Sequence, residues 1–340
     1  MRYIGGKTRL LPEIHNLVES KIKDNSKTFL DLFSGTGSVG NSFKPHFTIY
    51  ANDLLYFCYL LAAGTLVNNI PPAFKKLKKE IHGDVLDYLN CITPAPDESY
   101  FVLNNYSPFG NSKRQYFTTD NAGKIDAIRQ KIKYWFSRNK ISVEEKNYLL
   151  ACLIEAVSSI SNTTGTYGAY LKSWDKRAFK KLTLEHPILF NNGKENKAFN
   201  NDAIKLAKDL VVDICYIDPP YNTRQYSSNY HLLETIALYD YPKITGVTGI
   251  RDYSKRKISP FSRKRDAYDA FNELIKNVNA KHIIISYSSD GILSKKEISD
   301  ILHKHCDKKY YHFEEIKQNA YQSKIVRNSS VNEYLFYIKK

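Results

Sequence analysis

The stretch FLDLFSGTGSVG at residues 29–40, together with the segment FTIYANDL at 47–54, limits the possible folds more than any other part of the chain. The first begins as an apolar strand, passes through closely spaced glycines and continues as the start of a helix. The second is another strand and ends in Asn52-Asp53. Two strands joined through a helix form a βαβ unit, whose strands pair in parallel. The chain is therefore predicted to have an α/β fold.

Three later segments also have the pattern of strands. They are residues 213–217, residues 282–289 (HIIISYSS) and residues 333–338 (EYLFYI), the last after a polar turn region. Helical periodicity separates the first two of them, as expected for a sheet that is built from successive βα units.

The middle of the chain has a different pattern. Residues 66–194 are mostly helical in periodicity, and Ser142 with Glu145 forms a capping-box signature before a long apolar helix. We interpret this segment as a helical insertion into an α/β domain that is made of residues 1–65 and 195–340. Its edges interleave basic and aromatic residues, which suits contacts to phosphates and bases. The alternative is a loop whose aromatic side chains cover the core.

Composition favours a polyanionic partner. The 340 residues include 50 Lys and Arg and 35 Asp and Glu, a formal charge of +15, which indicates nucleic acid or simply a basic surface. The five cysteines form no C-x-x-C pair and the nine histidines no H-E-x-x-H motif, so we expect no metal. The longest apolar run, residues 56–63, is too short to span a membrane, and no signal peptide is apparent. These features predict a cytoplasmic protein.

The glycine turn after the first strand has the spacing of a nucleotide-binding loop. Gly35, Gly37 and Gly40 give G-x-G-x-x-G, and Asp53 follows sixteen residues after Gly37. Such a turn lets a ligand approach the backbone, and the acid can hold ribose hydroxyls. The pattern fits a nicotinamide dinucleotide, and it fits S-adenosylmethionine. A tight turn without a ligand is the third possibility.

Asp31 helps to choose between the two cofactors. A carboxylate in a buried strand needs a partner. The ammonium group of an amino acid would be one, and a dinucleotide has none, so Asp31 favours S-adenosylmethionine. A local lysine or backbone amides are the alternative.

The N-terminal segment RYIGGKTR (residues 2–9) contains Gly6-Lys7-Thr8, the last three letters of a phosphate loop. A phosphate loop also requires a glycine five residues before Gly6, where this chain has Met1. We therefore reject that interpretation. Gly6 and Lys7 would still allow close backbone approach and place a lysine beside a ligand, or they form a flexible turn.

The segment DICYIDPPYN (residues 213–222) ends a buried strand in Asp218-Pro219-Pro220-Tyr221. The two prolines stiffen the turn, so that the Asp218 carboxylate and the Pro219 carbonyl present two hydrogen-bond acceptors together. An exocyclic amino group offers the matching pair of donors. Tyr221 offers a face on which an everted base can stack. The turn is thus suited to bind an aromatic amine.

The electrophile would be the methyl group of S-adenosylmethionine, which needs no further activation. Catalysis would consist mainly of positioning and desolvation, with in-line attack of the amine nitrogen on the methyl carbon. A dinucleotide-dependent oxidoreductase would leave Pro219, Pro220 and Tyr221 without a role.

These motifs, in this order, resemble the Dam-like (alpha-order) family of prokaryotic DNA adenine-N6 methyltransferases of restriction-modification systems. RYIGGKTRLLPEI resembles the family's N-terminal cofactor motif, FLDLFSGTGSVG its cofactor loop, ANDL its ribose-binding acid, and DICYIDPPYN its catalytic motif. The segment at 223–240 resembles the region after the catalytic turn in one branch of the family. The resemblance implies a Rossmann-like S-adenosylmethionine-dependent methyltransferase sheet that carries an inserted, mostly helical target-recognition domain.

The resemblance also implies roles for individual residues. Asp218, Pro219, Pro220 and Tyr221 would be catalytic. The cofactor would be bound by Tyr3, Gly6, Lys7, Asp31, Phe33, Gly35, Gly37, Asp53, Asp202, Ala203 and Asp218. Lys7 and Asp31 would face the methionine part, Asp53 the ribose and Asp202 the adenine. Ala203 departs from the family, many members of which have an aromatic residue there.

The DNA contacts are expected to come from the insertion and from a basic stretch at residues 251–265, which has seven Lys or Arg in fifteen residues. Such a run can also be a solvated loop. The candidates are Lys113, Arg114, Tyr167, Lys172, Arg224, Tyr226, Arg251, Lys255, Arg256 and Lys257.

The predicted function is site-specific methyl transfer to N6 of a flipped-out adenine in duplex DNA. The alternatives are an RNA base methyltransferase, an NAD-dependent oxidoreductase and a catalytically silent DNA-binding protein. Single copies of the insertion and of the catalytic turn favour a monomer, and a restriction endonuclease is a possible partner. Association with the nucleoid would follow from DNA binding.

Overall fold

The computed structural model describes the chain except Arg2 and residues 253–257 and 318–330. It divides into two compact units. One comprises residues 1–6, 55–194 and 227–256, and the other residues 7–54, 195–226 and 257–340. The first is called the helical unit and the second the sheet unit. The helical unit thus includes residues 227–256 as well as the predicted insertion.

The sheet unit is built on seven strands in the order β3-β2-β1-β4-β7-β9-β8. Strands β3, β2, β1, β4 and β7 pair in parallel, whereas β9 runs antiparallel to β7 and β8. The strands are β1 (Thr28–Asp31), β2 (Thr48–Asn52), β3 (Lys197–Phe199), β4 (Val212–Ile217), β7 (Ala280–Ser288), β8 (Tyr311–Lys317) and β9 (Asn332–Lys339).

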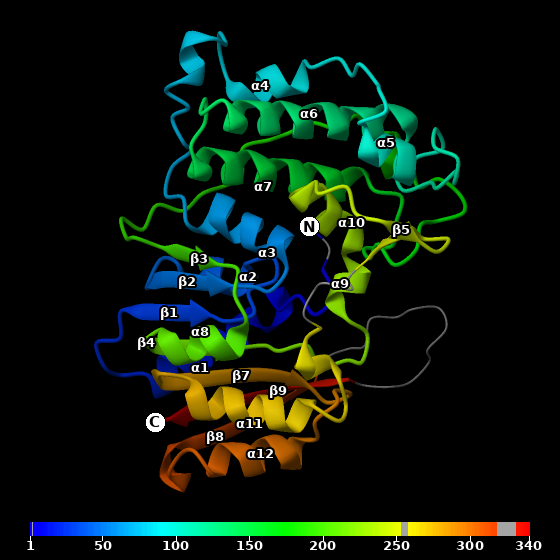
Figure 1. Ribbon diagram of the computed structural model, residues 1–340. Helices are drawn as coiled ribbons and strands as arrows, with labels where there is room; N and C mark the ends of the chain where they lie inside the picture. The colour runs from blue at the N-terminus through cyan, green and yellow to red at the C-terminus, as the bar shows by residue number, and fades with distance from the viewer. Residues whose placement is uncertain (2, 253–257, 318–330) are drawn as a thin grey trace. The chain divides into compact units, whose positions relative to one another are not determined.

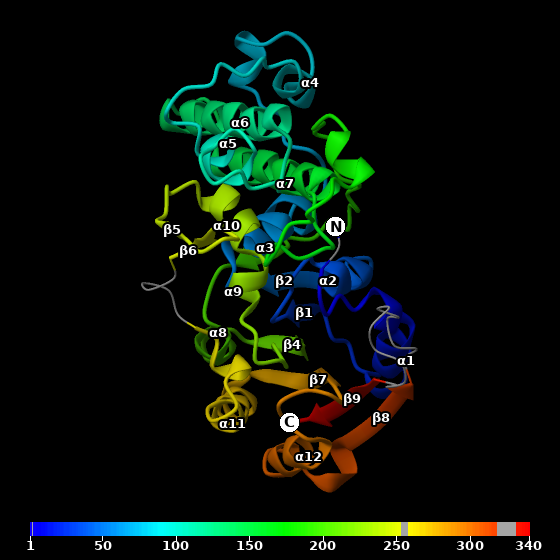
Figure 2. The same ribbon diagram turned by 90° about the vertical axis from the view of Figure 1, so that its right-hand side faces the viewer.

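The helices of the sheet unit cover both faces of this sheet, as Figures 1 and 2 show. α8, α11 and α12 lie on one face, where Leu30 and Leu32 of the β1 region belong to a core shared with Leu274 and Ile301. On the other face, the Phe29 ring stacks on Phe43 of α2 at 4.6 Å. The helices are α1 (Leu11–Lys21), α2 (Ser38–Phe43), α8 (Ala203–Asp209), α11 (Ala267–Asn277) and α12 (Lys295–His303).

The helical unit contains the long helices α6 (Thr119–Ser137) and α7 (Val143–Ile160), which pack against each other. The predicted capping box is confirmed, because the Ser142 hydroxyl accepts from Glu145 N and Glu145 accepts from Ser142 N. The remaining elements are α3 (Tyr56–Leu61), which continues as a π-helical turn at Ala62–Leu66, α4 (Val85–Asn90), α5 (Phe101–Tyr106), α10 (His231–Leu238), β5 (Ile244–Thr245) and β6 (Ile250–Arg251). The four-residue helix α9 (Tyr226–Asn229) crosses the boundary between the units.

Short 3₁₀ turns occur at Thr8–Leu10, Leu77–Lys79, Lys176–Phe179, Pro260–Ser262 and Lys308–Tyr310. All the strands predicted from the sequence are present. Two further strands of the large sheet were not predicted. β3 has only three residues at a sheet edge, and β8 is half-exposed and polar, so neither has the apolar run of a buried strand. Among the described residues, no helix is long and apolar enough to cross a membrane.

Candidate active site

The candidate site lies at the carboxyl ends of β1 and β4, the two central strands of the sheet. From β1 the chain crosses to β2 on one side, and from β4 it crosses to β7 on the other. Ligands of open α/β sheets bind in the crevice at such a switch in strand order. The register pairs Asp31 with Tyr216, so the residues that follow β1 lie beside the turn that follows β4.

The conformation of the glycine turn after β1 is fixed by its backbone angles and by a hydrogen bond to Asp53. Gly35 and Gly37 have φ angles of 52° and 77°, a region that favours glycine. Gly35 N donates to Asp53 Oδ2 at 2.9 Å, and Gly37 N donates to Ser34 O at 2.7 Å. The predicted ribose-binding acid and the cofactor turn are therefore in direct contact.

Asp31 is fully buried at the end of β1. Its Oδ2 accepts from Gly40 N at 3.0 Å. Burial raises the pKa of the Asp31 carboxyl to about 7, although the hydrogen bond from Gly40 works in the opposite direction. At neutral pH the site thus contains a carboxyl group near its titration midpoint, which a cationic ligand would ionise.

The loops after β2 and β3 are joined, and this brings Asp202 into the same region of the sheet unit as Asp53. Asn200 Nδ2 donates to Asp53 O at 2.8 Å, and Asp53 N donates to Phe199 O at 3.2 Å. Asp202 itself caps α8, where its Oδ1 accepts from Ile204 N at 3.1 Å. Ala203, the first residue of α8, is buried.

Asp218 sits directly after β4 beside a buried lysine. Lys7 Nζ lies 3.3 Å from Asp218 Oδ1 and 3.1 Å from Glu333 Oε2. The geometry at Asp218 is an ionic contact rather than a hydrogen bond, and Oδ1 is a buried acceptor that receives no hydrogen bond from the described residues. Such an acceptor is costly unless a ligand supplies a donor. This points to a ligand with a hydrogen-bond donor at Asp218.

Lys7, Asp218 and Glu333 lie close enough to shift the pKa values of Lys7 and Asp218. Burial, together with the neighbouring Glu333, raises the pKa of Asp218 to about 6, and Lys7 counteracts part of the rise. Burial alone would lower the pKa of Lys7, but Asp218 and Glu333 together raise it above its ordinary value. Lys7 therefore stays protonated, and Asp218 titrates just below neutral pH.

The rest of the Asp218–Tyr221 turn packs on the end of the sheet. Tyr221 O accepts from Ile292 N at 2.9 Å, and the half-buried Tyr221 ring stands edge-on to Tyr287 at 6.0 Å. Lys7 Nζ lies 5.2 Å from the centre of the Tyr221 ring. Pro219 is buried and Pro220 is half-buried. Phe33, from the cofactor motif, packs edge-on against Phe261 at 5.3 Å.

The family model for D12 class N6 adenine-specific DNA methyltransferases matches residues 3–301. The chain belongs to this family. It is 47% identical over its full length to the type II methyltransferase M.FokI of Planomicrobium okeanokoites, of which it covers 53%, and 43% identical to the modification methylase StsI of Streptococcus sanguinis, of which it covers 52%. Type II methyltransferase M.NlaIII of Neisseria lactamica is 35% identical, with 100% of this chain and 99% of that protein covered. The chain thus spans about half the length of the first two relatives.

Glu333 was missed by the sequence-based analysis of this D12 chain. It is the second residue of β9, which pairs Glu333 with Ser288 at the carboxyl end of β7. Because β9 is antiparallel to β7, its amino-terminal end, rather than its carboxyl end, lies at the edge of the sheet that carries Asp218. A charged residue that opens an otherwise apolar strand, EYLFYI, was the signal available in the sequence.

We expect Glu333→Gln to move the acid limb of the pH–rate profile to lower pH. The substitution removes a negative neighbour, so the pKa of Asp218 falls below about 6. The profile of methyl transfer between pH 5 and 8 measures this shift. Glu273→Gln on the exposed surface of α11 is the matched control, and an identical profile for both variants would contradict a role for Glu333.

Two predicted cofactor residues, Tyr3 and Gly6, belong to the helical unit. The Tyr3 ring stacks on Tyr230 at 4.6 Å, and Gly6 N donates to Tyr3 O at 3.3 Å. Within their own unit these residues thus form a packed N-terminal turn. Their contact with a cofactor remains a prediction.

Three predicted DNA-binding residues are buried and engaged in contacts within the helical unit. Arg114 donates to three backbone carbonyl groups and to Ser112 Oγ. Tyr167 is buried, and Arg251 Nη2 forms an ion pair with Asp240 at 2.6 Å. Sequence periodicity could not reveal this burial, because tertiary partners far along the chain create it. These contacts give the three side chains structural partners within the helical unit, and their contact with DNA stays a prediction from the sequence.

The other candidates for DNA contacts differ in exposure. Lys113, Lys172 and Arg224 are exposed and Tyr226 is half-buried. Lys255, Arg256 and Lys257 lie outside the described residues. Among the residues that the structure describes, no cluster of His, Cys, Asp and Glu is suited to hold a metal ion.

Proposed function

We propose that this D12 chain transfers a methyl group from S-adenosylmethionine to N6 of an adenine in duplex DNA. The observation that carries the proposal is the Asp218 carboxylate at the switch point of a methyltransferase-family sheet: its buried Oδ1 pairs with the Lys7 ammonium at 3.3 Å but receives no well-aligned hydrogen bond from the described residues. An adenine amino group supplies the missing donor. Membership of the family supports both the reaction and the target atom.

The adenine must leave the base stack to reach such a site. Its amino group then donates to Asp218 Oδ1 and to the Pro219 carbonyl, which orients the nitrogen lone pair. Tyr221 offers its ring to the everted base. Lys7 keeps Asp218 ionised near neutral pH and does not itself need to transfer a proton. The proton that N6 loses passes to Asp218 or to solvent.

The residues around the glycine turn fit S-adenosylmethionine. That cofactor supplies an electrophilic methyl group on a sulfonium centre. Asp31 offers a buried carboxylate to its ammonium group, the Gly35–Gly37 backbone allows close approach, and Asp53 offers an acceptor for a ribose hydroxyl. Asp202 would contact the adenine. A dinucleotide offers no ammonium group to Asp31, which favours the sulfonium cofactor.

We expect the affinity for S-adenosylmethionine to rise with pH. The pKa of Asp31 is about 7 in the free protein, and a bound ammonium group requires the ionised carboxylate. Below pH 7 each bound cofactor therefore releases a proton, and the apparent Kd should increase about tenfold per pH unit. Isothermal titration calorimetry between pH 5.5 and 8 measures this. Asp31→Asn should bind more weakly and with no such slope, and a flat wild-type profile would disprove the assignment.

We further propose that the sheet unit binds the cofactor and that the helical unit recognises the target. This adjusts the predicted boundaries, which placed residues 227–256 in the catalytic domain. The exposed side chains of Lys113, Lys172 and Arg224 would contact phosphates. Tyr226, Lys255, Arg256 and Lys257 stay candidates for DNA contacts from the sequence alone.

We also propose that the protein acts as a monomer in the prokaryotic cytoplasm and associates with the nucleoid through DNA. A cognate restriction endonuclease is the partner expected from the resemblance to methyltransferases of restriction-modification systems.

Transfer of tritiated methyl groups tests the function directly. The protein is incubated with labelled S-adenosylmethionine and with either duplex DNA or RNA. We expect label in N6-methyladenine of the duplex alone. Label in RNA, or a thermal stabilisation by NAD in place of S-adenosylmethionine, would overturn the proposal.

A further inference from the structure

The tip of the β5–β6 hairpin is fixed by buried side chains from residues 106–116 of the same unit. Arg114 Nη2 donates to Gly246 O at 3.0 Å and Arg114 Nε to Val247 O at 2.9 Å. Tyr106 donates its hydroxyl group to Gly249 O at 2.9 Å. The Tyr116 hydroxyl lies 2.9 Å from Thr248 O and 2.8 Å from Tyr167 O, and its one proton is shared between these two carbonyls. Four consecutive tip carbonyls thus have side-chain donors, which makes this short hairpin a rigid element.

This rigid tip holds an apolar side chain out into solvent. Val247 is 81% exposed. Gly249 has a φ of 70°, and a Cβ there would lie 2.9 Å from Arg114 Nε, so the clamp requires glycine at this position. A loop that served only to connect two elements would not need a buried arginine and two buried tyrosines to fix it. The construction is that of a preorganised binding element.

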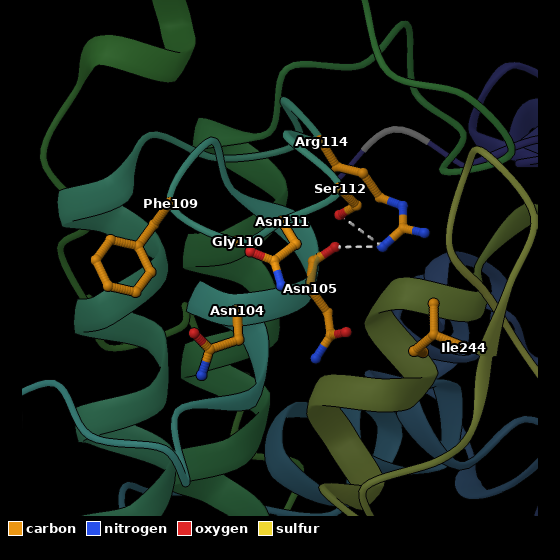
Figure 3. A pocket seen from close by; sticks show the side chains of 8 residues that line it. All are labelled: Asn104, Asn105, Phe109, Gly110, Asn111, Ser112, Arg114 and Ile244. Carbon is orange, nitrogen blue, oxygen red and sulfur yellow. Dashed lines mark hydrogen bonds between the residues drawn. The ribbon is translucent and has the colours of Figure 1, made fainter.

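A pocket of about 520 Å³ lies next to the hairpin. Figure 3 shows Asn104 and Asn105 projecting from α5, Asn111 on the loop that follows, and Ile244 of β5 opposite them. The other lining residues are Phe109, Gly110, Ser112 and Arg114. Gly110 lets this loop close on α5, because a Cβ would lie within 1.7 Å of Asn104 O.

The pocket offers neutral hydrogen-bonding groups. Asn104 Nδ2 donates to Tyr100 O at 2.7 Å, and Asn105 Nδ2 donates to Phe101 O at 2.9 Å. These bonds fix the orientation of the two amide groups, and the Oδ1 atom of each is a hydrogen-bond acceptor. Asn111 is exposed and brings both a donor and an acceptor. The Arg114 guanidinium group donates to backbone carbonyl groups and to Ser112 Oγ. The residues that line the pocket therefore offer a phosphate group no lysine or arginine without such partners.

We propose that this pocket, together with Val247, reads base edges of the recognition sequence in duplex DNA. The inference rests on the proposed function and extends it to the residues that determine sequence specificity. Fixed Oδ1 acceptors at Asn104 and Asn105 suit the exocyclic amino groups of adenine or cytosine, and asparagine can bind adenine through two hydrogen bonds. Val247 and Ile244 supply apolar contacts of the kind made to a thymine methyl group.

The test compares single variants Asn104→Ala, Asn111→Ala and Val247→Ser with the wild type. DNA from cells that express each variant is sequenced with modified-base detection. Methyl transfer is then measured on the cognate site and on sites with one changed base pair. We expect the preference for the cognate base to fall about 10- to 100-fold at one position. Asn277→Ala, at the end of α11 in the sheet unit, is the matched control.

A second readout separates base contacts from phosphate contacts. Because the pocket lacks a free charge, these variants should leave the salt dependence of DNA binding unchanged. The inference would be overturned if the variants bound all DNA sequences equally more weakly, or if the salt dependence of their DNA binding changed. It would also be overturned if variants with the melting temperature of the wild type kept its preference for the cognate base pair.

The same variants in an Asp218→Ala background keep the two proposals distinguishable. Binding of labelled duplexes then reports sequence discrimination without any methyl transfer. If the wild-type protein fails to methylate DNA, the proposed function fails, while this binding comparison still decides whether the pocket reads bases. Loss of discrimination in binding supports the pocket, and its retention rejects it.

Discussion

Replacing Asp218 with alanine is expected to reduce methyl transfer about 100- to 1,000-fold, while S-adenosylmethionine binding changes little. The substitution removes the buried acceptor that orients the amino group, and loss of one preorganised hydrogen-bonding group at a reacting atom costs on the order of 100- to 1,000-fold. The truncated side chain also leaves Lys7 with Glu333 as its remaining carboxylate contact. Single-turnover methyl transfer and calorimetric cofactor binding measure the two effects separately.

Asp218→Asn is the matched control for this result. Asparagine keeps the shape and one acceptor but loses the negative charge beside Lys7, so we expect an intermediate rate that no longer depends on the titration near pH 6. A rate for Asp218→Ala within tenfold of the wild type would show that the carboxylate does not act on the substrate. If Asp218→Ala weakened cofactor binding as much as it lowered methyl transfer, the carboxylate would be assigned to cofactor binding instead.

Replacing Lys7 with methionine is expected to lower methyl transfer at pH 7 by about a hundredfold. Without the lysine, Asp218 and Glu333 share a buried site with no counter-charge, and breaking a buried ion pair from one side is strongly unfavourable. The pKa of Asp218 then rises above about 6, so the acid limb moves to higher pH, the opposite direction to Glu333→Gln. The pH–rate profile at saturating cofactor measures it.

The double variant Lys7→Met/Glu333→Gln tests the mechanism of this effect. It replaces the lysine and one carboxylate with neutral groups, so the acid limb should return toward that of the wild type even if the rate stays reduced. Should Lys7→Met keep the wild-type profile, the ionisation of Asp218 would not depend on Lys7. The Kd of the Lys7→Met variant for the cofactor, measured separately, shows how much of the loss in rate comes from weaker cofactor binding.

The strands that carry the chemistry were predictable because their signals are local. The buried runs of β1, β2 and β4 each end in the motif that comes after them, and strands of a parallel sheet present those ends at one edge. The glycine spacing predicted a turn with left-handed residues, and Gly35 and Gly37 have that geometry. The capping box before α7 depends on residues three apart and was equally readable.

The burial of two DNA-binding candidates could not be predicted from local patterns. Arg114 and Arg251 occur in basic, polar stretches that resemble solvated loops, yet both are buried by partners more than ten residues away in sequence. A guanidinium group that meets several carbonyl oxygens serves as a structural crosslink. Neither the count of charges nor their spacing distinguishes such an arginine from one that contacts phosphate.

Local patterns were sufficient to predict the α/β fold and to place Asp31, Asp53 and Asp218 at or just after the ends of strands, because each of these features depends on neighbours within one strand and turn. Which charged side chains contact one another depends instead on the tertiary structure. Lys7, Asp218 and Glu333 come together from three separate parts of the chain through sheet pairing. The asparagine pocket and the clamped hairpin arise in the same way. Pairing of distant segments is set by the energy of packing the whole chain, which no local pattern records.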